Sequence, residues 1–65
     1  MTIIETITNA QKQITIRKVV IWNPNVSQAL YAGAPNEIPK TLQNKTAISF
    51  RYDRDKQRVI IRVGT

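Results

Sequence analysis

The sequence contains neither cysteine nor histidine. Without cysteine, the chain forms no disulfide bond and no thiolate metal site, which fits a reducing compartment. Without histidine, it lacks the commonest general base and metal ligand of enzymes. We therefore predict a protein that is not an enzyme, needs no cofactor or metal and has no small-molecule substrate.

Acidic residues are also scarce, because four Asp or Glu face ten Lys or Arg, for a net charge of +6. Residues 1–39 carry three basic and two acidic side chains, whereas residues 40–65 carry seven and two, so the second part has a net charge of 7 − 2 = +5. Such an asymmetry indicates an anionic partner, although it also serves solubility alone. Asp53 and Asp55 lie among arginines, which favours their charged forms and opposes a metal site.

Long apolar runs are absent, and the longest, "VVIW", is far too short to span a membrane. We therefore predict no membrane partner. The start "MTIIETITNAQK" lacks the basic and apolar regions of a signal peptide. The expected location is the cytoplasm or the inside of a viral particle.

A chain of 65 residues makes one small domain, residues 1–65. Its Ile, Val and Thr residues favour strands. We predict a mainly β fold with four or five strands in an antiparallel sheet or small open barrel, a C-terminal hairpin and at most one short helix. The stretch "TIIETIT" alternates only loosely, so residues 1–11 are predicted to form an edge strand or arm.

The segment "KQITIRKVVIW" is predicted to be a strand that is more buried in its second half. After it, Asn23 and Pro24 resemble a helix start and Gly33 a helix stop, so residues 23–33 favour a short helix. The alternative is a short strand that follows an Asn-Pro turn. The predicted core comprises Ile14, Ile16, Val20, Trp22, Leu30, Ile48, Phe50, Ile61 and Val63.

The C-terminal hairpin, 47–53 with 57–63, has the clearest pattern. If Phe50 lies opposite Ile61, the apolar side chains share one face and Asp53 faces Arg58, whereas a shift by one residue mixes the faces. The connection Arg54–Gln57 then forms a four-residue loop, since a two-residue loop would require Lys at positive φ. The predicted pairs are Ile48 with Val63, Ser49 with Arg62, Phe50 with Ile61, Arg51 with Ile60, Tyr52 with Val59 and Asp53 with Arg58.

Two functions fit this pattern. The first is a structural or assembly role, in which strand edges pair with another copy or with another protein, as in a virion component. Its predicted interface residues are apolar or aromatic: Ile3, Ile4, Ile7 and Tyr31.

The alternative is nucleic-acid binding, in which basic side chains contact the phosphate backbone. Phe50 and Tyr52 are expected on the face opposite the arginines, Trp22 in the core, and only Tyr31 free to stack on a base. This arrangement ranks nucleic-acid binding just below assembly. The predicted anion-binding residues are Arg17, Lys18, Arg51, Arg54, Lys56, Arg58 and Arg62.

Overall fold

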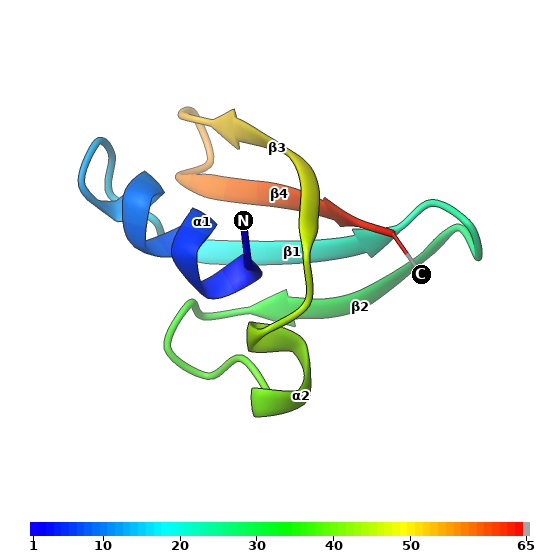
Figure 1. Ribbon diagram of the computed structural model, residues 1–65. Helices are drawn as coiled ribbons and strands as arrows, with labels where there is room; N and C mark the ends of the chain where they lie inside the picture. Colours follow the sequence, from blue (N-terminus) through cyan, green and yellow to red (C-terminus); the bar gives the residue numbers. More distant parts are fainter. Residues whose placement is uncertain (65) are drawn as a thin grey trace.

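The computed structural model describes residues 1–64 and contains four strands and two helices. In chain order these are α1 (Ile3–Gln11), β1 (Lys18–Asn23), β2 (Gln28–Gly33), α2 (Lys40–Gln43), β3 (Ala47–Asp53) and β4 (Arg58–Val63). The strands form one sheet in the order β2-β1-β4-β3 (Figure 1). The predicted mainly β class is confirmed, with a mixed sheet, because two antiparallel hairpins join through the parallel pair β1–β4.

Most of residues 1–11 form the helix α1, Ile3–Gln11, and only Thr2 makes a single bridge to Thr46, so the predicted edge strand or arm is wrong. A capping box begins α1: the backbone N–H of Glu5 donates to Thr2 Oγ1 at 3.2 Å, and that of Thr2 donates to Glu5 Oε1 at 3.0 Å. Ile3, Ile7 and Ala10 are buried at helical spacing. Burial of this stripe on the sheet overrides the strand preference of Ile and Thr, because propensity is a weak term beside tertiary packing.

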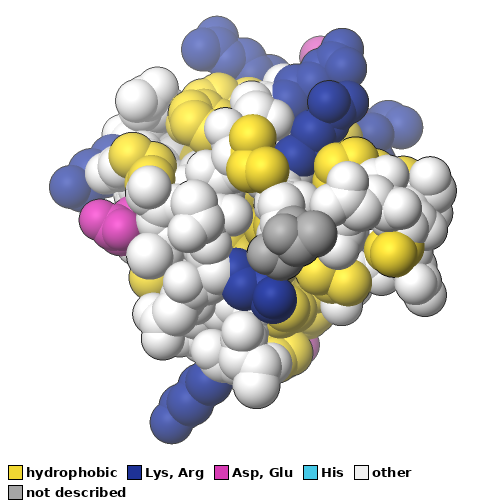
Figure 2. Space-filling model, turned by 45° about the vertical axis from the view of Figure 1, so that its right-hand side comes forward, with side chains coloured by type: hydrophobic (Ala, Val, Ile, Leu, Met, Phe, Trp, Pro, Cys, Tyr) yellow, Lys and Arg dark blue, Asp and Glu magenta, His cyan; other side chains and the backbone are white. Residues whose placement is uncertain are grey.

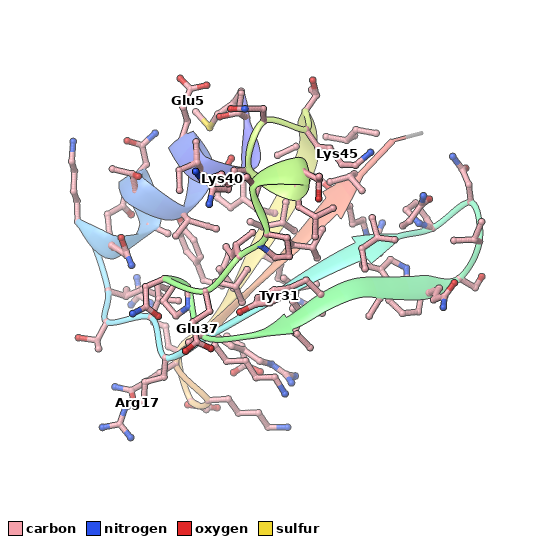
Figure 3. All side chains as sticks on the ribbon, turned by 90° about the horizontal axis from the view of Figure 1, so that it is seen from below. Glu5, Arg17, Tyr31, Glu37, Lys40 and Lys45 are labelled. Carbon is pink, nitrogen blue, oxygen red and sulfur yellow. The ribbon has the colours of Figure 1, made fainter. Side chains whose placement is uncertain are left out.

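Both helices lie on one side of the sheet, as the views in Figures 1 and 3 agree. On this side the apolar stripe of α1 forms one core cluster with alternate residues of β1 and β4. Within residues 1–64, the opposite side of the sheet carries no helix. The buried core comprises Ile3, Ile7, Ala10, Ile16, Val19, Ile21, Ile38, Val59, Ile61 and Val63.

The predicted core is correct for Ile16, Ile61 and Val63, whereas β1 buries the other face from the one predicted. Val19 and Ile21 are fully buried, but Val20 and Trp22 are half-buried on the far side. The chain before Lys18 is not a strand, so the alternation that begins at Ile16 does not continue through β1. Of the other predicted core residues, Ile14 is partly buried, whereas Leu30, Ile48 and Phe50 are exposed by 37%, 67% and 47%.

The predicted β3–β4 hairpin is confirmed in five of its six pairs, from Ser49 with Arg62 to Asp53 with Arg58. The register shifts between Ala47 and Ser49, so Ala47 and not Ile48 lies opposite Val63. This bulge, on an edge strand, explains the exposure of Ile48. The four-residue turn 54–57 is also as predicted, and Gln57 closes it at a φ of 51°.

The segment 23–33 is a turn and a strand, so the favoured helix is wrong and the alternative is correct. Asn23 Oδ1 accepts a hydrogen bond from the Asn25 backbone at 3.0 Å, which starts the turn 24–27. Ser27 ends the turn at a φ of 49°. A helix of two turns is marginal in isolation, whereas β2 gains a full ladder with β1.

Candidate functional site

The side of the sheet without helices presents a mixed basic and apolar surface, here called the open face. Residues paired across strands point to the same side, so the pairing of β4 with its neighbours assigns its members. Arg58, Ile60 and Arg62 alternate with the buried Val59, Ile61 and Val63 and therefore point outward. The open face consists of Lys18, Val20, Trp22, Ala29, Ala32, Ser49, Arg51, Asp53, Arg58, Ile60 and Arg62.

Trp22 lies beside Arg62 on this face, because the two are register partners in the parallel pair β1–β4. The prediction that Trp22 belongs to the core, on the side away from the arginines, is wrong. Val20 and Ile60 form the next pair and, like Trp22, are half-buried. The Trp22 ring thus lies next to the apolar pair Val20 and Ile60, on the same face as the arginine side chains.

Two shallow depressions cross the open face and share Arg51 and Ile60 in their linings. One, of about 310 Å³, is lined by Trp22, Ser49, Phe50, Arg51, Ile60 and Arg62. The other, of about 530 Å³, is lined by Arg51, Tyr52, Asp53, Arg54, Asp55, Arg58 and Ile60. Together they make one open groove that runs from Trp22 to the tip of the β3–β4 hairpin.

The charge of the groove is positive, since only one of its arginines is paired. Arg58 Nε lies 3.2 Å from Asp53 Oδ2, as predicted from their position across the hairpin, and this is the one ion pair within residues 1–64. Lys18, Arg51 and Arg62 are exposed. In Figure 2 basic side chains gather at the upper right of the molecule, where little acidic surface accompanies them.

The remaining predicted basic residues extend the open face at one end. Arg54 and Lys56 are exposed in the turn 54–57. The backbone N–H of Arg17 donates to the carbonyl of Gln57 at 2.7 Å, which holds Arg17 next to that turn, and its side chain points away from both helices (Figure 3). The structure therefore brings all seven predicted anion-binding residues to one face and the adjoining end of the sheet.

The predicted interface residues do not form a common surface. Ile3 and Ile7 are buried beneath α1, because the segment is a helix, and only Ile4 points outward. Tyr31 lies opposite Ile21 on the helix side, and its hydroxyl donates to the Ala34 carbonyl at 2.6 Å. Tyr31 is therefore partly buried and anchored, and the expectation of a free aromatic ring there is wrong.

The described residues offer little to other kinds of chemistry. Among residues 1–64, no three acidic side chains gather in a way that could hold a metal ion. No buried side-chain nitrogen or oxygen in the same part of the chain lacks a hydrogen-bond partner. None of the helices in residues 1–64 has the length and apolar character that crossing a bilayer requires. The open face is thus where this part of the chain concentrates charge beside exposed apolar surface.

Comparison of the chain with protein-family models, with curated protein sequences and with solved structures finds no match.

Proposed function

We propose that the protein binds single-stranded nucleic acid on its open face and acts as a binding protein without catalytic activity. The observation that carries this proposal is the placement of Trp22 next to Arg62 on an uncovered sheet surface. Proteins that hold single strands combine aromatic rings, on which bases stack, with basic side chains that contact phosphates. Arg51 and Lys18 add exposed positive charge on the same face.

A single strand suits this surface better than a duplex. Base stacking on Trp22 requires an unpaired base whose flat face is accessible, which the interior of a duplex does not offer. The groove is open and shallow, and its basic residues lie on either side of the apolar pair Val20 and Ile60. A backbone lying along the groove therefore meets arginines while one base covers the indole ring.

The structure changes the order of the two functions predicted from the sequence. Nucleic-acid binding ranked second because the aromatic residues were expected on the face opposite the arginines. Trp22 removes that objection, although Phe50 and Tyr52 do lie on the helix side, with ring centroids 5.2 Å apart. Assembly through strand edges loses its first candidate, since residues 3–11 are a helix.

Titration with a single-stranded oligonucleotide tests the proposal, and Trp22 provides the signal because it is the chain's one tryptophan. We expect saturable quenching of its fluorescence. The logarithm of the binding constant should fall against the logarithm of salt concentration with a slope of about −2 to −3, as three or four phosphate contacts require. The double variant Arg51→Ala/Arg62→Ala should weaken binding of all base sequences alike and reduce the slope by one to two units.

The matched control is Lys40→Ala/Lys45→Ala, which removes the same charge from the helix side of the molecule, where Figure 3 shows both lysines. It should leave the affinity nearly unchanged. Equal losses in the two double variants would mean that net charge alone attracts the oligonucleotide. No saturable change at low salt would contradict the proposal and leave an acidic protein surface as the remaining partner for the open face.

A further inference from the structure

The outer edge of β2 is the part of the sheet least protected against pairing with another strand. β2 pairs only with β1, and none of its backbone groups takes part in other backbone hydrogen bonds within residues 1–64. Its sequence, "QALYAG", contains no charge and no proline. The one protective feature in β2 is the bulge at Leu30. We infer that two copies of the chain pair antiparallel through β2, so that their sheets join into one.

The distribution of charge makes β2 the edge at which two copies of the chain can meet. All charged residues of the four strands lie on the other three: Lys18 on β1, Arg51 and Asp53 on β3, and Arg58 and Arg62 on β4. Two chains of net charge +6 repel each other, and pairing through β2 keeps the basic halves of the two sheets farthest apart. The uncharged edge thus allows a contact that the rest of the sheet opposes.

The opposite edge of the sheet is already occupied where β3 begins. The backbone N–H of Ala47 donates to the Met1 carbonyl at 2.8 Å, and that of Ile3 donates to the Lys45 carbonyl at 2.9 Å. Thr2 and Thr46 form an antiparallel bridge between these bonds. Farther along, β3 carries Arg51 and Asp53. The chain's own N-terminus and these charges protect β3, which leaves β2 as the edge for pairing.

α2 lies past the outer edge of β2 but not in the plane of the sheet. In Figure 1, α2 is seen past β2, but Figure 3 shows that it is displaced to the helix side of the sheet. Leu42 of α2 packs partly buried against the core, which holds α2 on that side. Exposed Leu30 lies at the middle of β2, so antiparallel pairing of identical strands brings the two copies of Leu30 together near the symmetry axis.

Pairing of this kind also joins the two open faces. Antiparallel union of identical strands has a twofold axis perpendicular to the sheet, so both open faces point to the same side. The two copies of β2 would separate the β1 strands that carry Trp22 by three strand spacings, or about 14 Å. Ala29 and Ala32 would line the floor between them. The joined faces would hold a longer single strand than one copy does, and this consequence, unlike the dimer itself, rests on the proposed nucleic-acid binding.

Sedimentation equilibrium of the full chain without nucleic acid tests the dimer. We expect the mass to rise with concentration from 7.4 kDa toward twice that value. Leu30→Lys and Ala32→Lys each place like charges across the axis and should weaken association at least about tenfold. Ile48→Lys adds the same charge at an exposed position of β3 and should have no effect.

Circular dichroism of each variant verifies that a loss of association is not a loss of folding. A monomer at millimolar concentration, or equal weakening by Ile48→Lys, would overturn the inference. If the monomer still binds the oligonucleotide, the proposed function stands without the dimer. If the dimer forms and no oligonucleotide binds, the proposed function alone fails.

Discussion

Trp22 and Arg62 are register partners on adjacent parallel strands, and both point away from the helices. Each comes from a different hairpin, so the pair exists only where β1 joins β4. The pair therefore belongs to the joined sheet.

Replacing Trp22 by alanine should weaken binding of a labelled single-stranded oligonucleotide by about 1–3 kcal/mol, the usual contribution of one stacked base. Trp22→Phe should restore part of the loss, because phenylalanine still offers a flat ring. Fluorescence anisotropy of the label measures both effects without using tryptophan emission. Tyr31→Ala is the matched control, since Tyr31 is aromatic but lies on the helix side of β2 and lines neither depression of the groove. An equal loss in that variant would remove the specific role of Trp22.

Neighbouring residues of β1 should differ sharply in their effect on stability. Ile21→Ala empties a fully buried site and should lower the free energy of unfolding by about 2–5 kcal/mol. Val20→Ala, on the open face, should lower it by about 1 kcal/mol. Urea denaturation compares the two, and Ile21→Val, with an expected loss of about 0.5–1.5 kcal/mol, serves if Ile21→Ala does not fold. A larger loss of stability in Val20→Ala than in Ile21→Ala would mean that Val20, and not Ile21, faces the core.

The capping box should make stability depend on pH in the acidic range. Hydrogen bonds from the Thr2 backbone and side chain hold the pKa of Glu5 below its ordinary value of 4.5. The unfolded chain thus binds the proton more tightly, and the stabilisation by Glu5 is present above pH 4.5 and is lost as the pH falls through the folded-state pKa. Thermal unfolding between pH 2 and 7 should show a smaller decrease on acidification for Glu5→Gln than for the wild type. Glu37→Gln, which changes an exposed loop carboxylate, should keep the wild-type decrease.

Glycine should stabilise the last position of both hairpin turns. Ser27 and Gln57 have φ angles of 49° and 51°, in the left-handed region that costs a side-chain-bearing residue about 1–2 kcal/mol. Ser27→Gly and Gln57→Gly should each raise the free energy of unfolding by about 0.5–1 kcal/mol. This net gain is smaller than the relieved strain, because glycine also increases the conformational entropy of the unfolded chain. Chemical denaturation provides the measurement. Val26→Gly, one position earlier in the first turn, should bring no gain.

The β3–β4 hairpin could be predicted from the sequence because its information is local. Apolar residues and the Asp53–Arg58 pair lie in register across a short turn, and a shift by one residue visibly mixes the faces. The first helix could have been found as well, since Thr2 and Glu5 have the spacing of a capping box. The content of Ile and Thr favoured a strand there, and packing on the sheet outweighed that preference.

The face that β1 buries could not be predicted from β1 alone. Val19, Val20, Ile21 and Trp22 are apolar on both sides, so alternation does not distinguish them. What decides is the position of α1, together with the parallel pairing to β4, and both are relations between distant segments. For the same reason the candidate site could not be predicted. Which face of β1 is buried decides whether Trp22 lies beside the arginines, and β1 alone does not specify that face.

The parallel pairing between β1 and β4 affects when the groove forms during folding. Each hairpin closes a short loop, whereas the β1–β4 contact closes a long one and is expected to form more slowly. The groove from Trp22 to the hairpin tip therefore exists only after the slowest step of folding. A ligand in that groove contacts both hairpins and binds only the completed fold, so it stabilises the long-range contact by an amount that grows as the ligand concentration exceeds the dissociation constant.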